Sequence, residues 1–321
     1  IRGCFNLGSS FYQDIALKTE SKHHLVKTVR RFDLLHLIID TFKLNFRNIS
    51  EPFKFYKLAI RKIFRWWIYN KKMKVLIFGS KGLVGSSVSK KITEVEPSYK
   101  LVKSSREDTN LFSYIETSKK IKEEKPDVVI IAAAKVGGIY ANNTNRYQFI
   151  VENLKINLNI LEALAEYSKT KIINIGSSCI YPLGVKNPIS EDSLMTGKLE
   201  PTNSPYSMAK LVSVELGKTL KTQFGHEVIN LMPTNLYGPN DKFEEMNSHV
   251  IPGLMYKMHE AKVKGAKTVE IWGSGNPLRE FMHVDDLASA IIFLLKKEVS
   301  QDILNIGSGE EVSIKVLATK I

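Results

Sequence analysis

The sequence predicts an α/β protein built on a Rossmann-type, doubly wound parallel sheet, and three observations support this fold class. From residue 73 onward, short and almost wholly apolar segments alternate with amphipathic segments, as expected for a parallel sheet covered by helices on both faces. A glycine-rich turn follows the first apolar segment and opens a helix, as in nucleotide-binding folds. Much further along the chain, Tyr206 and Lys210 stand four residues apart in a helical segment.

The predicted elements follow one another with short connections and without internal repeats. Segments rich in Val, Ile and Leu are predicted as buried strands because both faces of a parallel sheet are covered. Longer segments of mixed polarity between them are predicted as helices. Strands are expected at 74–78, 99–103, 128–132, 172–175 and 228–232, and helices at 83–95, 111–124, 144–168 and 205–224.

A chain of 321 residues is long enough for one large domain and a smaller one. We expect a mainly helical basic extension over 1–72, a dinucleotide-binding domain over 73–240 and a smaller substrate-binding domain over 241–321. The apolar segment near 303–306 is expected to return to the first sheet as a further strand.

The basic character of the chain belongs to its N-terminal extension. The net charge is +13, but 15 of the 46 Lys and Arg residues and only 5 of the 33 acidic residues lie in 1–72. The remainder is nearly neutral, so no nucleic-acid partner is expected. Residues 53–69 mix aromatic with basic side chains, which suits peripheral contact with a membrane surface. Packing on an upstream domain and membership of a separate module remain alternatives, and because the first residue is Ile we expect the natural N-terminus to lie upstream.

Cysteine usage indicates a reducing compartment. Cys4 and Cys179 lie in different segments and predict no disulfide framework. No apolar run is long enough to span a bilayer, and no signal-peptide pattern is present. We therefore expect a cytoplasmic protein, and no residue spacing suggests a metal site.

The glycine-rich turn has the spacing G-x-x-G-x-x-G after the strand 74–78. Glycines let the backbone approach a pyrophosphate, and the N-terminus of the following helix favours its negative charge. The predicted cofactor contacts here are Gly79, Lys81, Gly82, Leu83, Val84 and Gly85.

The end of the second strand favours NADP over NAD. An NAD site usually places an Asp or Glu there for the ribose hydroxyls, whereas this chain has none before Glu107. Arg106 and Lys81 can instead pair with a 2′-phosphate. The alternative is that Arg106 is only a solvated turn residue.

Tyr206 and Lys210 share one face of a helix because they are four residues apart. A neighbouring ammonium favours phenolate, so we expect the pKa of Tyr206 to be lowered and its hydroxyl to exchange a proton with a sugar oxygen. Ser177 follows the strand 172–175, at the edge where ligands bind, and can hydrogen-bond a substrate carbonyl.

Together, Ser177, Tyr206 and Lys210 resemble the Ser/Tyr/Lys set of the extended short-chain dehydrogenase/reductases. Five further motifs resemble the GDP-L-fucose synthase family, and the resemblance runs in order over about 73–321. These motifs are Ala132 to Ile139, Met232 to Pro239, Asn247 to Pro252, Trp272 to Gly275 and Arg279 to Asp286.

The resemblance implies a two-stage reaction on GDP-4-keto-6-deoxy-D-mannose, namely epimerisation at C3 and C5 and then reduction at C4 by NADPH. It implies that Cys179 and His249 are the acid–base pair of the epimerisation, and ordinary Cys and His pKa values bracket neutrality. Tyr206 and Ser177 would stabilise the enolate oxygen. Lys210 would hold the nicotinamide ribose, and Ala132, Ala133 and Ala134 match positions beside the cofactor.

By the same resemblance, Asn235 and Arg279 contact the nucleotide diphosphate and Trp272 lies near the nucleotide. Lys257 stands where the family often has Arg, which keeps the charge but loses the bidentate fork. Family members continue for several elements beyond the position of Ile321, so an incomplete substrate domain is expected.

A homodimer is also implied, through the helix bearing Tyr206 and the helix near 144–168. The apolar positions Ile150, Leu154, Leu158 and Leu161 suit that interface or packing on the sheet equally well. His283 is expected to support structure, with Asp285 or Asp286 capping the next helix.

Two other functions remain open at this stage. One is a different nucleotide-sugar 4-epimerase or 4,6-dehydratase, although Ser178-Cys179-Ile180 lacks the acidic residue that a dehydratase usually carries there. The other is a membrane-associated nucleotide-binding scaffold without turnover.

Overall fold

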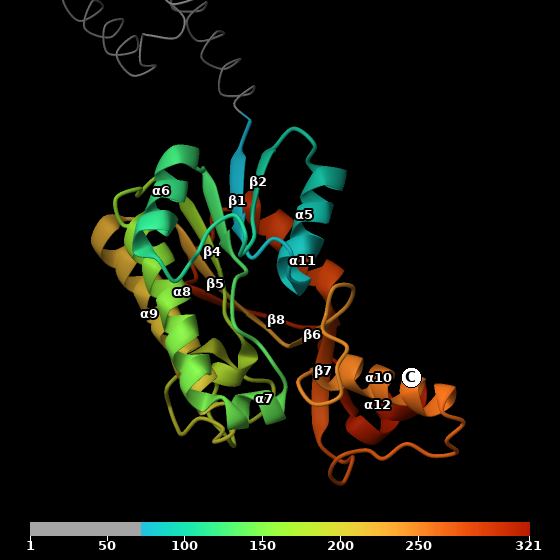
Figure 1. The fold of residues 1–321 in the computed structure, drawn as a ribbon. Coiled ribbons are helices and arrows are strands. Elements are labelled where there is room, and N and C mark those ends of the chain that lie inside the picture. The colour runs from blue at the N-terminus through green and yellow to red at the C-terminus, as the bar shows by residue number, and fades with distance from the viewer. Residues whose placement is uncertain (1–71) are drawn as a thin grey trace, which may run out of the picture. The chain divides into compact units, whose positions relative to one another are not determined.

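The computed structural model describes residues 72–321 (Figure 1). The predictions for the extension, including its helices and the membrane contact through 53–69, lie outside the described residues. In the part that is described, no helix is both long enough and apolar enough to cross a membrane.

A six-stranded parallel sheet forms the centre of the fold, with the order β2-β1-β3-β4-β5-β8, which confirms the predicted fold class. The chain order reverses between β1 and β3, and such reversals place the ligand crevice at the carboxyl ends of the strands. The strands are β1 (Lys74–Phe78), β2 (Lys100–Ser104), β3 (Val128–Ile131), β4 (Lys171–Ile175), β5 (Val228–Pro233) and β8 (Ile303–Ile306).

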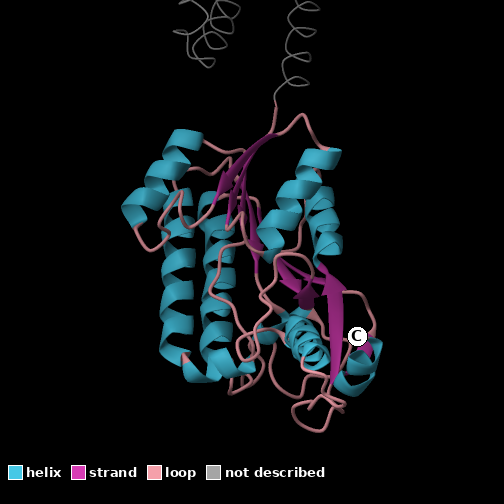
Figure 2. Ribbon diagram, turned by 45° about the vertical axis from the view of Figure 1, so that its right-hand side comes forward, coloured by secondary structure: helices cyan, strands magenta, loops and turns pink. Residues whose placement is uncertain are grey.

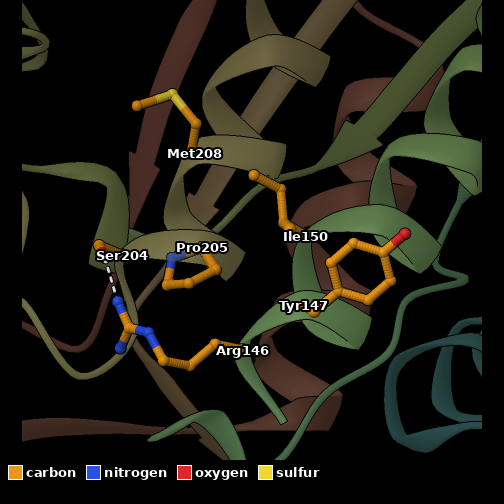
Figure 3. Close-up of a pocket in the computed structure, with 6 residues that line it drawn as sticks. All are labelled: Arg146, Tyr147, Ile150, Ser204, Pro205 and Met208. Carbon is orange, nitrogen blue, oxygen red and sulfur yellow. Dashed lines mark hydrogen bonds between the residues drawn. The ribbon is translucent and has the colours of Figure 1, made fainter.

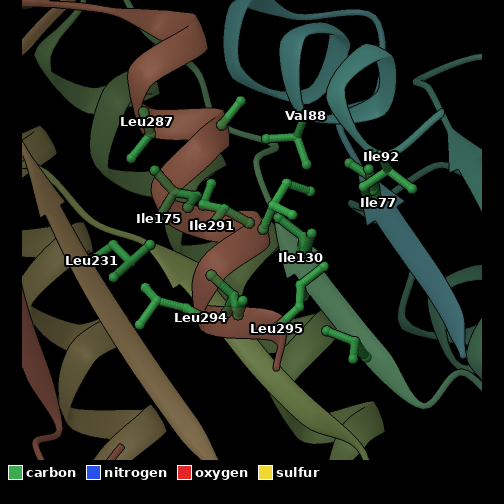
Figure 4. Close-up of a cluster of buried hydrophobic side chains, with 14 of the residues drawn as sticks. Ile77, Val88, Ile92, Ile130, Ile175, Leu231, Leu287, Ile291, Leu294 and Leu295 are labelled. Atoms are coloured by element: carbon green, nitrogen blue, oxygen red, sulfur yellow. The ribbon is translucent and has the colours of Figure 1, made fainter. Parts of the chain in front are cut away.

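Helices cover both faces of this sheet (Figures 1 and 2). One face carries α5 (Leu83–Val95) and α11 (Val284–Leu295), whose apolar sides share a core with the sheet (Figure 4). The other face carries α6 (Tyr114–Glu124), α8 (Arg146–Leu164) and α9 (Ser204–Phe224).

The two cores explain why the central strands are apolar throughout. Ile130 and Ile173 point into the core beneath α11, whereas Val129 and Ile172 point into the core beneath α8 and α9. All four residues are completely buried. Complete burial of such a side chain contributes about 1.5–3 kcal/mol, so the sheet is a rigid base for the loops at its edge.

A smaller layer follows β5 in the chain. Its sheet has the order β6-β7-β9, with β6 (Asn235–Tyr237) parallel and β9 (Glu311–Ser313) antiparallel to β7 (Leu278–His283). The helices α10 (Val250–Val263) and α12 (Ile314–Lys320) accompany it. Because α11 and β8 pack with the large sheet, the segment 241–321 contributes to both layers, and a domain boundary at 240 stays a prediction.

Three local boundaries differ from the sequence expectation. The helix expected near 144–168 is α8, which begins at Arg146 and ends at Leu164, and a short helix that was not predicted, α7 (Ile139–Thr144), precedes it, separated from it by the non-helical conformation of Asn145. Helix α6 begins at Tyr114 since the Ser113 hydroxyl accepts the N–H of Glu116 at its start. His283, rather than an Asp, caps α11 by accepting the N–H of Asp285, while the Asp285 carboxylate accepts a hydrogen bond from Ser87 on α5.

Candidate active site

The glycine-rich turn is shaped by two very close backbone approaches. Gly79 has φ +84°, and a Cβ there would lie 2.6 Å from the nitrogen of Ala133. A Cβ on Gly85 would lie 2.2 Å from the carbonyl oxygen of Gly79. Gly79 and Ser80 both donate backbone hydrogen bonds to the Ser104 carbonyl, at 2.9 and 3.1 Å. The turn is therefore held against the ends of β2 and β3 with no room for side chains.

Gly82 precedes α5 and provides no side-chain cap. The first N–H groups of that helix, beginning with those of Leu83 and Val84, are therefore available to an anion at its positive end. Gly82 itself is not sterically required, because a Cβ there would meet only the Gly79 carbonyl, at 3.5 Å.

The basic residues beside the turn are both exposed. Lys81 forms an ion pair with Glu107, which raises the pKa of the lysine. Sequence reasoning missed this pairing because Glu107 lies beyond the strand end. An exposed pair contributes little free energy, so Lys81 can exchange Glu107 for a phosphate. Within residues 72–321, Arg106 takes part in no ion pair.

The segment after β3 lies beside the glycine-rich turn, as predicted. The N–H of Ala132 donates to the Phe78 carbonyl at 3.0 Å, and Ala133 forms the wall against which Gly79 packs. Ala132, Ala133 and Ala134 are all half-buried. The structure thus brings the predicted cofactor residues of β1, β2 and β3 to one edge of the sheet.

Shortly after β4, Cys179 lies in a 3₁₀ turn, Ser178–Ile180, and Ser177 is the N-cap residue of that turn. The Ser177 hydroxyl accepts the N–H of Cys179 at 3.4 Å. The Ser207 hydroxyl donates to the Cys179 carbonyl at 2.9 Å, and this bond ties the turn to α9 beside Tyr206.

Tyr206 and Lys210 occupy the inward face of α9. Lys210 is 2% exposed and its Nζ donates to the Ile175 carbonyl at 2.6 Å, at the end of β4. The same Nζ lies 5.9 Å from the centroid of the Tyr206 ring. Helical spacing therefore places both side chains at the strand end that also carries Ser177.

Burial dominates the electrostatics of this cluster. It raises the pKa of Tyr206, with a smaller contribution from the charge of Cys179, so the sequence expectation of a lowered pKa is wrong. The cause is that Lys210 points its ammonium at the Ile175 carbonyl, while the half-buried Tyr206 side chain is partly removed from water. Burial also lowers the pKa of Lys210 to about 8 and raises that of Cys179. The Tyr206 hydroxyl accordingly keeps its proton at neutral pH.

His249 stands immediately before α10, at its N-cap position, with a side chain that is 42% exposed. The loop before it is closed by Ser248, whose hydroxyl accepts the N–H of Glu244 and donates to the Lys242 carbonyl, both at 2.6 Å. The N–H of Gly138 donates to the Asn247 carbonyl at 3.0 Å.

Contacts connect the His249 loop to Tyr206. A Cβ on Gly138 would lie 2.2 Å from the Ser248 carbonyl, and one on Gly137 would lie 3.2 Å from the ring of Phe149. Phe149 in turn meets Tyr206 edge to face, with ring centroids 6.4 Å apart. The sequence analysis did not single out Phe149, because an apolar residue on a helix is usually part of the hydrophobic core. The adjacent glycines were a usable signal of close approach.

The predicted substrate residues lie in the smaller layer, and two of them contact each other. The Nζ of Lys257 lies 4.3 Å from the ring centroid of Trp272, a cation–π contact. Asn235 on β6 donates to the Glu280 carbonyl on the neighbouring strand β7 at 2.8 Å. Arg279, on β7, is exposed, and one guanidinium nitrogen donates to the Leu278 carbonyl at 2.7 Å.

Over residues 72–321, the structure contains no group of three or more His, Cys, Asp or Glu side chains arranged to hold a metal ion. The Cys179 thiol is free.

Comparison with known proteins agrees with this geometry. Residues 75–307 match the NAD dependent epimerase/dehydratase family. GDP-L-fucose synthase 1 of Arabidopsis thaliana is 46% identical over 249 residues, which cover 78% of this chain and 77% of the relative. GDP-L-fucose synthase of Escherichia coli (strain K12) is 42% identical over 259 residues, covering 78% and 80%.

A solved GDP-L-fucose synthetase from Naegleria fowleri, bound to NADP, has a TM-score of 0.70 and 29% identity, covering 77% of this chain and 81% of that one. The fold, the arrangement at the carboxyl edge of the sheet and these similarities agree. The chain therefore belongs to the NAD dependent epimerase/dehydratase family and, within it, to the GDP-L-fucose synthases.

Proposed function

We propose that this chain converts GDP-4-keto-6-deoxy-D-mannose to GDP-L-fucose, by inversion at C3 and C5 and NADPH-dependent reduction of the C4 ketone. The observation that carries the proposal is the meeting of Ser177, Tyr206 and Lys210 at the end of β4, at the same edge of the sheet as the glycine-rich turn. Curated relatives named GDP-L-fucose synthase, at 42–46% identity, favour this reaction over that of another epimerase or dehydratase and over a passive scaffold.

The cofactor residues fit NADP. Gly79 and Gly85 have no side chains, and a Cβ at either position would collide with the backbone that surrounds the turn. The uncapped N-terminus of α5 supplies N–H donors for the pyrophosphate. Arg106 and Lys81 offer cations for the 2′-phosphate. When bound, NADPH supplies the hydride for C4.

In the reduction, the Tyr206 hydroxyl donates its proton to the C4 oxygen as the ketone becomes an alcohol. The raised pKa of Tyr206 means that this proton is present beforehand. The Ser177 hydroxyl hydrogen-bonds the same oxygen and fixes its position. Lys210, anchored to the Ile175 carbonyl, supports the phenolate that forms and holds the nicotinamide ribose.

In the epimerisation, the C4 ketone makes the protons at C3 and C5 acidic, and Tyr206 and Ser177 stabilise the enolate oxygen. Cys179 and His249 act from opposite faces of the sugar: one removes a proton from carbon and the other returns one. Support comes from the contacts that run from Tyr206 through Phe149 and the adjacent Gly137 and Gly138 to the His249 loop.

For the GDP moiety, we assign the diphosphate to Asn235 and Arg279, which lie on neighbouring strands of the smaller sheet. Trp272 offers its ring near the nucleotide, and Lys257 adds a positive charge beside it.

A homodimer through α8 and α9 is part of the proposal. A shallow apolar hollow lies between the starts of these helices (Figure 3). Tyr147 is 72% exposed and Met208 46%, and Leu158 is also exposed further along α8, whereas Leu161 packs into the core beneath the sheet. The hollow is lined by Arg146, Tyr147, Ile150, Ser204, Pro205 and Met208. We place the reaction in the cytoplasm on the cysteine usage alone.

The test is turnover of GDP-4-keto-6-deoxy-D-mannose with NADPH in deuterated water, with the product examined by mass spectrometry and NMR. GDP-L-fucose carrying deuterium at C3 and C5, together with NADP formation, is the expected result. Reduction without deuterium would remove Cys179 and His249 from the proposal. Absence of both reactions would contradict the proposed function.

A further inference from the structure

One buried carboxylate near the site has no role in the reaction described above. The side chain of Asp241 is 7% exposed. Its Oδ1 accepts the N–H of Lys242 at 2.8 Å, while its Oδ2 is buried and has no hydrogen-bond partner within residues 72–321. An unpaired buried carboxylate oxygen is costly, so its presence calls for a partner that the fold brings to it.

The charged group beside this carboxylate is His249, which approaches Oδ1 rather than the unpartnered Oδ2. Its Nδ1 lies 3.8 Å from Asp241 Oδ1, which is within ion-pair range but too long for a hydrogen bond. The imidazole side chain is 42% exposed. Hydrogen bonds between catalytic groups are often long until substrate is bound, so this separation is compatible with a working pair.

The loop between the two residues is anchored at both ends. Asn240 has φ +68°, a left-handed conformation that turns the chain just before Asp241, and its side chain donates to Ser86 on α5 at 3.1 Å. At the other end, Ser248 bonds both Glu244 and Lys242. The backbone therefore fixes the spacing between Asp241 and His249.

We propose that Asp241 is the positioning residue of His249. This inference rests on the proposed function. The Asp241 carboxylate accepts the Nδ1–H of the imidazole, which leaves Nε2 facing the sugar. It also stabilises the positive ring that exists whenever Nε2 carries a proton as well, as in hydrolases that pair Asp with His.

The proton balance is simple. When Nε2 takes a proton from a sugar carbon, the electron pair of the C–H bond moves into the enolate and the ring becomes imidazolium. Cys179 then gives its thiol proton to the same carbon from the opposite face, and the electron pair of the enolate forms the new C–H bond, so the carbon is inverted. Where Cys179 is the base instead, His249 gives its Nε2 proton to the carbon and the ring becomes neutral. Exchange with water restores the starting protonation of both side chains. Asp241 exchanges no proton with the sugar and touches neither carbon.

A purely local role for Asp241 explains less. Closing the turn needs one oxygen, and the bond from Lys242 already supplies it. The other acidic residues of the loop, Glu244 and Glu245, are exposed, and Glu244 accepts from Asn247 at 3.2 Å. Among the described residues, Asp241 is the carboxylate in ion-pair range of His249.

The test is Asp241→Asn, which keeps the shape and the oxygen for Lys242 but removes the charge. Formation of GDP-L-fucose should fall about 10²–10⁴-fold, because the epimerisation loses its oriented imidazole. Pre-steady-state oxidation of GDP-L-fucose by NADP⁺, which needs only the C4 step, should keep the wild-type rate. Glu245→Gln removes one negative charge from the same loop and should change neither rate.

Unchanged GDP-L-fucose formation by Asp241→Asn would overturn the inference, as would equal losses in the two assays. A ¹⁵N NMR spectrum of His249 in the wild-type protein tests it without any variant: the Nδ1–H tautomer is expected, and the Nε2–H tautomer contradicts it. If the wild-type protein itself oxidises no GDP-L-fucose, the proposed function fails instead.

Discussion

The two parts of the candidate site, the Tyr206 and Lys210 pair on α9 and His249 on a loop, are supported by very different kinds of structure. Tyr206 and Lys210 sit on a long helix packed against the sheet, and Lys210, only 2% exposed, is fixed to the end of β4. His249 stands at the end of a surface loop, 42% exposed, with its loop closed by hydrogen bonds of Ser248 and Asn240.

This difference matches the demands of the two half-reactions. Reduction at C4 needs one fixed geometry between ketone and proton donor, which a helix on a rigid sheet provides. Inversion at both C3 and C5 asks one acid–base pair to serve two carbons, and a partly exposed imidazole has room to do so. Changes at α9 should therefore affect both half-reactions, whereas changes at the loop should affect epimerisation alone.

The largest effect is expected for Tyr206→Phe. Loss of the hydroxyl removes the proton donor of the reduction and a hydrogen bond to the enolate, so kcat should fall about 10²–10⁴-fold. The ring contact with Phe149 is retained, and the melting temperature should not fall. Single-turnover NADPH oxidation measures the rate, and a variant that still reduces the substrate at the wild-type rate would remove Tyr206 from the mechanism.

Gly79→Ala should be next in size. The new Cβ would lie 2.6 Å from the Ala133 nitrogen at φ +84°, and strain of this kind costs about 1–3 kcal/mol. Both the free energy of unfolding and the affinity for NADPH should drop, as measured by denaturant titration and by nucleotide fluorescence. Gly82→Ala is the matched control for stability, because its Cβ would make only an ordinary contact at 3.5 Å. Equal destabilisation by both substitutions would contradict the proposed fit.

The pH dependence of stability tests the burial of Lys210. Burial lowers its pKa to about 8 in the folded protein, from the ordinary lysine value of 10.5. Between these values the unfolded chain binds more protons, so the contribution of Lys210 to stability rises with pH, with a slope approaching about 1.4 kcal/mol per pH unit.

The measurement is urea unfolding of the wild-type protein and of Lys210→Met at pH 7 to 10. The difference in the free energy of unfolding, wild type minus variant, should grow above pH 8 in favour of the wild type. If the difference in unfolding free energy does not change with pH, the pKa of Lys210 is not lowered in the folded protein. Subtracting the variant removes the opposing titration of Tyr206, whose pKa is raised by burial.

The smallest effect is expected at the exposed substrate pair. Trp272→Ala removes the cation–π contact with Lys257, and such contacts contribute about 0.5–1 kcal/mol at exposed sites. The KM for the GDP-sugar should rise about 2–5-fold with kcat and NADPH affinity unchanged. Trp272→Phe retains an aromatic face, and its KM should lie between those of the wild-type protein and Trp272→Ala. A large fall in kcat would place Trp272 in the chemistry instead.

The sequence predicted the large sheet and its helices well, because continuous Val and Ile segments and helical periodicity are local signals. It also allowed the prediction that Ser177, Tyr206 and Lys210 lie at one edge of the sheet, because the carboxyl ends of parallel strands lie at the same edge. It could not give the direction of the Tyr206 pKa shift, which depends on where Lys210 points, nor the pairing of Lys81 with Glu107. The role of Asp241 could not be predicted from the sequence either, because its burial and its distance to His249 depend on the fold.

The most direct test of the division between the two parts compares His249→Gln with the wild-type protein in both directions of the reaction. The account predicts that the variant makes almost no GDP-L-fucose from the 4-keto sugar, yet oxidises GDP-L-fucose with NADP⁺ at the wild-type rate in a single turnover. If the variant loses both activities together, or neither, the assignment of epimerisation to the loop and of reduction to α9 is wrong.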